Sequence, residues 1–239
     1  MTRLATLVAA ALFACALPAS LFAQPQPAPA EASRPTGQGG QRPPERGPER
    51  LPADSVTQHT VELPGRTLRL TATAGSIPLN DPQGGLQAEI GYVAYTLPNA
   101  DPATRPVTFA LNGGPGAASA YLHLGVLGPW RLPLDGPTIS PSSSPALVPN
   151  AETWLDFTDL VFIDPVGTGY SRGVGSGEDL RNRYFNIEGD IGTLSEVVAR
   201  WLRSRDRLLS PKFFVGESYG GFRGPKLANA LRSDHGVAL

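Results

Sequence analysis

From residue 56 onward, apolar and polar positions follow patterns that predict β-strands. Residues 56–63 and 66–73 are short runs rich in Thr, Val and Leu, and the turn-forming pair Pro64-Gly65 separates them. Residues 86–97 alternate between apolar and polar side chains and contain aromatic and β-branched residues. These patterns predict antiparallel hairpins at the start of a sheet.

Continuous apolar runs come next. Residues 106–111 and 159–163 are mostly apolar, and each run is followed by a segment rich in Gly and Pro. Such runs are typical of parallel strands that are covered on both faces. Residues 212–215 form a third short apolar strand. The stretch between the first two runs, through the Ser- and Pro-rich residues 137–149, is expected to be a loop.

A helical period appears before the third apolar run. Apolar residues recur there at steps of four, three, four and three: Ile187, Ile191, Leu194, Val198 and Trp201. This spacing predicts an amphipathic helix, for which Asn186 is a plausible N-cap. A second helical pattern runs from residue 219 to about 232. The strand-helix order predicts an α/β domain with a mostly parallel central sheet and right-handed crossovers.

The N-terminal region has a different character. Residues 1–23 carry an early Arg, an apolar run and small residues, which is the layout of a secretory signal peptide rather than of a stable membrane span. Residues 24–55 hold eight prolines and little apolar surface, so we expect a disordered linker. The domain would then occupy residues 56–239 of an exported protein, either periplasmic or secreted. Lipid attachment at Cys15 is an alternative.

Composition excludes several classes of function. The formal net charge is -1, and basic residues do not cluster as they would on a nucleic-acid-binding face. Cys15 is the only cysteine and lies in the predicted signal peptide, so disulfides and cysteine-based metal sites are excluded from the rest of this chain. No metal or organic cofactor is expected. The oligomeric state is left open.

Residues 216–220, Gly-Glu-Ser-Tyr-Gly, match the G-x-S-x-G pattern of a nucleophile elbow. An apolar strand precedes this elbow and a helix follows it, which is the context that gives the pattern meaning. The glycines let the chain turn sharply and expose Ser218, and the helix N-terminus favours the negative charge that develops during attack. We therefore expect Ser218 to be a nucleophile; a chance Gly-Ser turn is the alternative.

Residues 112–116, Asn-Gly-Gly-Pro-Gly, form a glycine loop after another apolar strand. Backbone N–H groups in such a loop can approach a ligand closely. In folds with this kind of elbow, one oxyanion donor comes from an early loop and the other from the residue after the nucleophile. This indicates Gly114 and Tyr219 as the donors, because Pro115 has no N–H.

Three segments together resemble the serine carboxypeptidase family, which has the α/β-hydrolase fold. The segments are LNGGPGAAS, WLDFTDLVFIDPVGTGYS and FFVGESYGG, in residues 111–119, 154–171 and 213–221. The resemblance implies that Ser218 is acylated. It also implies that Asn112, Gly113 and Glu217 bind the terminal carboxylate of a peptide substrate. A structural carboxylate bonded to backbone amides is the alternative for Glu217.

The sequence departs from the family pattern at three positions. Val126 stands where the family often has a second Glu that pairs with the carboxyl beside the nucleophile. Carboxyl groups that share a proton act mainly at acid pH, so we expect a weaker acid preference here. Ala117 replaces a common Cys. Phe222 replaces a frequent His, with a role that we expect to be packing only.

A serine nucleophile also needs a His base and an acid, which in this fold follow the Ser in the chain. Asp234 and His235 lie about 25 Å further along one helix, so they are rejected. His123 is expected to be structural and His59 to lie on the surface. We therefore expect a chain truncated after the nucleophile helix, whose full-length parent is a carboxypeptidase acting on peptides with a free C-terminal carboxylate. The alternatives are an esterase or acyltransferase on the same fold, or a catalytically inactive binding domain.

Overall fold

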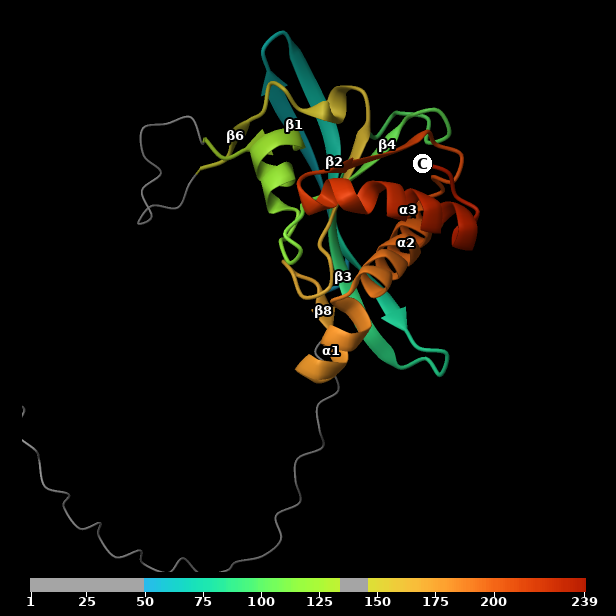
Figure 1. Cartoon of the computed structure of the whole chain (residues 1–239). Coiled ribbons are helices and arrows are strands. Elements are labelled where there is room, and N and C mark those ends of the chain that lie inside the picture. Colours follow the sequence, from blue (N-terminus) through green and yellow to red (C-terminus); the bar gives the residue numbers. More distant parts are fainter. Residues whose placement is uncertain (1–49, 134–145) are drawn as a thin grey trace, which may run out of the picture. The chain divides into compact units, whose positions relative to one another are not determined.

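A mixed β-sheet forms the centre of the computed structural model, which describes residues 50–133 and 146–239 (Figure 1). The strand order is β1-β2-β3-β7-β4-β9, and β8 pairs with β3 beside β7. The main strands are β1 (Ser55–Leu63), β2 (Arg66–Asn80), β3 (Leu86–Thr96), β4 (Val107–Leu111), β7 (Asp159–Ile163) and β9 (Lys212–Gly216). The short strands are β5 (Trp130–Arg131), β6 (Val148–Pro149) and β8 (Arg172–Gly173).

The strand directions match the sequence pattern. Strands β1, β2 and β3 form antiparallel hairpins, and β3 joins β7 antiparallel. Strands β7, β4 and β9 run parallel to one another. Strand β2 extends to Asn80, past the predicted end at residue 73, because its second half pairs with the first half of β3. The predicted α/β class is confirmed, with a parallel part that adjoins the antiparallel hairpins.

The described residues contain three α-helices: α1 (Gly177–Tyr184) and α2 (Ile187–Ser204) lie between β8 and β9 in the chain, and α3 (Tyr219–His235) follows β9. Helix α2 begins as predicted, since the Asn186 side chain accepts a hydrogen bond from the N–H of Gly189 at 2.8 Å. The segment expected to be loop contains two short helical turns, η1 (Leu122–Leu127) and η2 (Trp154–Asp156), besides β5 and β6. Residues 134–145 of that segment lie outside the described residues.

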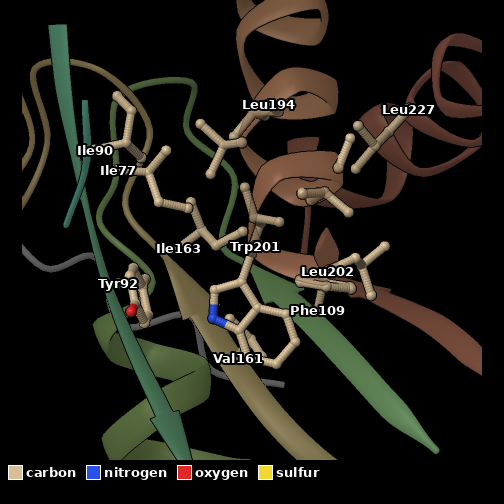
Figure 2. Close-up of a cluster of buried hydrophobic side chains, with 14 of the residues drawn as sticks. Ile77, Ile90, Tyr92, Phe109, Val161, Ile163, Leu194, Trp201, Leu202 and Leu227 are labelled. Atoms are coloured by element: carbon tan, nitrogen blue, oxygen red, sulfur yellow. The ribbon is translucent and has the colours of Figure 1, made fainter. Parts of the chain in front are cut away.

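Helices α2 and α3 pack on one face of the sheet, where they form the larger of two buried apolar clusters (Figure 2). The strands contribute alternate residues to this cluster, because neighbouring side chains on a strand point to opposite faces. Trp201 of α2 contacts Phe109 of β4 edge to face, with ring centres 5.5 Å apart. In Figure 2 Leu194 and Leu227 reach the same cluster from the two helices. This packing fixes α3, and with it the elbow, against the sheet.

The other face of the sheet has its own apolar cluster. Leu160 and Phe162 of β7 point into it, whereas Val161 and Ile163 point to the helical side. Residues of η1 and η2 cover this second cluster. Strands β4 and β7 are buried along their whole length, which confirms that they are covered on both faces.

The ordered contacts of the domain begin before residue 56. Arg50 forms an ion pair with the buried Glu89 at 2.9 Å, and the N–H of Leu51 donates to the same carboxylate. Asp54 accepts hydrogen bonds from Tyr92 and Arg205. These contacts show that residues 50–54, which the sequence assigned to the linker, contact the sheet. The predicted signal peptide, the linker up to residue 49 and Cys15 lie outside the described residues.

No helix within residues 50–133 and 146–239 is long and apolar enough to cross a lipid bilayer.

Candidate active site

Ser218 lies in the turn between β9 and α3. Its backbone has φ 54° and ψ -121°, a region that costs a non-glycine residue energy, and the residue is exposed. A Cβ on Gly216 would lie 2.1 Å from the carbonyl carbon of Gly220. A Cβ on Gly220 would lie 2.4 Å from the carbonyl oxygen of Leu111. The two glycines of the elbow are therefore required for the close packing that presents Ser218.

The glycine loop lies directly against the elbow. A Cβ on Gly113 would lie 2.4 Å from the backbone nitrogen of Tyr219 and 3.0 Å from the Cβ of Ser218. The N–H of Glu217 donates to the carbonyl of Leu111 at 3.2 Å. This contact follows from the sheet, because β4 and β9 are adjacent parallel strands and their following loops leave the same edge. The loops that carry the predicted oxyanion donors are thus brought together.

The two predicted oxyanion donors differ in their surroundings. Tyr219 is the first residue of α3, so its N–H has no acceptor within the helix and lies at the positive end of the helix dipole. Gly114 is exposed and has φ 107°, a conformation that favours glycine. Both residues flank the contact between Gly113 and the elbow.

The predicted carboxylate-binding residues also lie together. The side-chain amide of the buried Asn112 donates to Oε2 of Glu217 at 3.1 Å. The amide oxygen of Asn112 accepts from the N–H of Leu122, which begins η1. Gly113 follows Asn112 at the centre of the contact with the elbow. Asn112, Gly113 and Glu217 therefore form one group beside Ser218.

Sequence reasoning missed Arg223, which is the most heavily bonded side chain near the elbow. Its guanidinium donates to both carboxylate oxygens of Asp190, at 2.7 and 3.1 Å. It also donates to the carbonyl oxygen of Asn112 at 2.8 Å. Its central carbon lies 4.8 Å from the centre of the Tyr219 ring. A charged residue five positions after the nucleophile, on the first turns of α3, was the available signal.

The histidines of the chain have partners away from Ser218. The ring of His123 lies 2.7 Å from the hydroxyl of Tyr95 and stacks on Phe162 at 4.5 Å between ring centres, which is the structural role expected for it. Burial lowers the pKa of His123 to about 4. The other two also contact residues outside the elbow: His59 bonds Thr57 on the surface, and His235 contacts Ser195 and Glu196 of α2.

The loop after β7 is held by its aspartate. One oxygen of Asp164 accepts from the N–H of Ser119 at 2.9 Å, and the other accepts from the N–H of Tyr170 at 3.2 Å. A Cβ on Gly169 would lie 1.9 Å from this carboxylate. Asp164 therefore joins the loop after β7 to the segment after the glycine loop.

A cavity of about 540 Å³ opens beside the elbow. The glycine loop, the loop after β7, the start of α2 and two residues of α3, Tyr219 and Arg223, line it. Its apolar residues include Val166, Tyr184, Ile187 and Leu194. In the described part of the chain, no group of three or more His, Cys, Asp or Glu side chains is placed to hold a metal ion.

Phe222 lies on the first turn of α3, and Val126 lies on η1. Phe222 is half exposed and stacks on Tyr219 with 5.1 Å between ring centres. The Lys226 ammonium lies 5.1 Å from the centre of the Phe222 ring. Val126 is exposed on η1, and Ala117 is exposed after the glycine loop.

A strained, exposed serine between a parallel strand and a helix, with a glycine loop from the adjacent strand against it, defines an α/β-hydrolase. Comparisons with known proteins narrow this class. The family model "Serine carboxypeptidase" matches residues 86–237. The chain therefore belongs to the serine carboxypeptidase family.

Individual relatives match only in part. Serine carboxypeptidase-like 5 of Arabidopsis thaliana is 30% identical over 157 residues, which are 62% of this chain and 34% of the relative. The pheromone-processing carboxypeptidase KEX1 of Uncinocarpus reesii is 33% identical over 130 residues, 51% of this chain and 17% of the relative. The chain thus spans about a third or less of the length of these relatives.

One solved structure, the peroxisomal α/β-hydrolase Lpx1 of Saccharomyces cerevisiae, is similar to 75% of this chain. The similarity covers 40% of that protein, with a TM-score of 0.32 and 16% sequence identity.

Proposed function

We propose that this chain forms the nucleophile-bearing part of a serine carboxypeptidase that releases C-terminal residues from peptides. The observation that carries the proposal is the group of Asn112, Gly113 and Glu217 beside the strained Ser218. A nucleophile alone would serve any acyl transfer. Donors for a terminal carboxylate next to it favour an exopeptidase.

In this mechanism the hydroxyl of Ser218 attacks the last peptide carbonyl and forms a bond to its carbon. The N–H groups of Gly114 and Tyr219 stabilise the negative charge on the carbonyl oxygen. The C–N bond then breaks, and the proton taken from Ser218 leaves on the amino group of the released residue. Water hydrolyses the acyl-enzyme and regenerates Ser218.

A carboxylate of the substrate is oriented by the other three residues. Gly113 can donate its backbone N–H, and the amide of Asn112 can donate from the same loop. Glu217 accepts a hydrogen bond from Asn112, and it can donate to a substrate carboxylate only when it is protonated. The arrangement favours substrates that end in a free carboxylate.

A base and an acid complete the reaction. Because the histidines of this chain contact other residues, we propose that a further segment of a longer protein supplies the His and its carboxylate. The 239-residue chain by itself is then expected to lack normal turnover. We also propose that the longer protein is exported through the N-terminal segment.

The test uses the longer protein that carries the proposed His and carboxylate. It compares the turnover of a blocked dipeptide that has a free C-terminal carboxylate with the turnover of the same dipeptide as its C-terminal amide. The proposal predicts faster release from the free acid, and no release by Ser218→Ala. Equal rates on both substrates would contradict the carboxypeptidase and favour an esterase or acyltransferase. No turnover of either substrate would favour a binding domain.

A further inference from the structure

Arg223 contacts three parts of the site, and it is one of the residues that line the cavity beside the elbow. It is 1% exposed, and Asp190, its ionic partner on α2, is also largely buried. A forked pair with two hydrogen bonds holds the guanidinium in one orientation. The remaining contacts of Arg223, to Asn112 and Tyr219, go to residues of the proposed site.

The hydrogen bond to Asn112 sets the direction of a neighbouring donor. Arg223 donates to the carbonyl oxygen of Asn112, and that carbonyl shares its peptide group with the N–H of Gly113. This peptide bond is trans, so the carbonyl and the N–H point in opposite directions. With the oxygen held by Arg223, the N–H of Gly113 points away from Arg223.

The same hydrogen bond strengthens that donor. The positively charged guanidinium that donates to the carbonyl oxygen draws electron density from the peptide group. Hydrogen bonds that share a peptide group also polarise one another. The effect is largest where water is excluded, and both Asn112 and Gly113 are buried. The N–H of Gly113 is thus oriented and polarised at the point where a substrate carboxylate would lie.

We propose that Arg223, held by Asp190, is a positioning residue for carboxylate recognition. It acts through the Asn112–Gly113 peptide group, whose carbonyl oxygen it holds. This proposal rests on the proposed function, because it assigns Gly113 to the terminal carboxylate. It adds that selectivity for a free carboxylate depends on a buried ion pair between α2 and α3.

The test is the affinity of the 239-residue chain for N-acetyl-phenylalanine and for its amide, measured by calorimetry. Binding needs neither the base nor turnover. Arg223→Lys keeps the charge but loses the fork, and Arg223→Gln loses both. We expect each variant to bind the free acid about tenfold more weakly, and the amide less than twofold more weakly.

Arg207→Lys is the matched control. Arg207 is a buried arginine that pairs with Asp159 at 2.6 Å, at the other ends of β4 and β7. The control should lose stability in the same way as Arg223→Lys, which urea unfolding measures, but keep the acid-over-amide ratio. If Arg223 had only a structural role, the ratio of acid affinity to amide affinity would change equally in Arg223→Lys and Arg207→Lys, or in neither of them.

Three results would overturn the proposal, and they differ from one another. An unchanged ratio in both Arg223 variants would show that Arg223 does not position the donor. An equal loss of the ratio in Arg207→Lys would show a general effect of stability. A wild-type chain that binds the acid and the amide equally would overturn the carboxylate site itself. The dipeptide turnover assay tests the proposed function separately, since binding can persist where turnover fails.

Discussion

Replacing Gly113 with alanine places a methyl group in the contact between the glycine loop and the elbow. The new Cβ would lie 2.4 Å from the nitrogen of Tyr219 and 2.8 Å from the carbonyl oxygen of Glu217. Both neighbours are backbone atoms, so no side-chain rotation relieves the overlap. An ordinary contact at 3.4 Å or more requires the two loops to separate by about 1 Å.

This separation has two consequences of predictable size. Overpacking of a buried contact destabilises a protein by about 1–3 kcal/mol, so we expect Gly113→Ala to lower the free energy of unfolding by that amount. A displacement of about 1 Å at a reacting centre can reduce a rate by about 10²-fold. We expect the rate at which a fluorophosphonate modifies Ser218 to fall by this factor in the longer protein that carries the proposed His and carboxylate.

Gly192→Ala is the control for this prediction. Gly192 lies exposed within α2, and a Cβ there would meet no atom within 4 Å. Alanine is the better helix former by about 0.5–1 kcal/mol, so this variant should be more stable than the wild type. Urea unfolding measures both variants. Wild-type stability and an unchanged labelling rate in Gly113→Ala would refute the close contact on which the site depends.

Three further predictions concern stability and are measured by urea unfolding. Burial lowers the pKa of His123 from 6.5 to about 4, so the unfolded chain binds a proton more readily. This contribution to stability is complete above pH 6.5, and about 3 kcal/mol of it is lost as the pH falls to 4. His123→Gln should remove this dependence of the free energy of unfolding on pH. If the dependence persists in the variant, it does not come from His123. Asp159→Asn leaves Arg105 and Arg207 without their buried carboxylate and should cost about 3–5 kcal/mol; a loss below 1 kcal/mol would show that water compensates the charges. Gly236→Ala forces alanine to a φ of 66° at the end of α3 and should lower the free energy of unfolding by about 1–2 kcal/mol. An unchanged free energy of unfolding would show that the end of the helix unwinds without loss.

The elements that the sequence predicted well are those with a local signal. The apolar runs of β4 and β7 and the period of α2 follow directly from side-chain burial, and Asn186 marks the start of α2 through a contact three residues away. Helix α1 was missed because it is polar and short. Its only signal is the capping box of Ser176 and Asp179, each of which bonds the backbone of the other.

Contacts between distant parts of the chain had no such signal. Arg223 and Asp190 are separated by 33 residues, and their pairing depends on how α2 and α3 pack. Arg50 is followed by a Pro-containing segment that has the composition of a linker, yet it pairs with Glu89 on β3. Charged partners of this kind became visible only when the folded arrangement was known.

Ser218 is proposed as the nucleophile of a serine carboxypeptidase, and mass mapping tests this after a fluorophosphonate has reacted with the longer protein that carries the proposed His and carboxylate. We expect one adduct, on the tryptic peptide of residues 213–223, which is absent in Ser218→Ala and slow to form in the 239-residue chain alone. An adduct on another residue, or one that persists in Ser218→Ala, would contradict it.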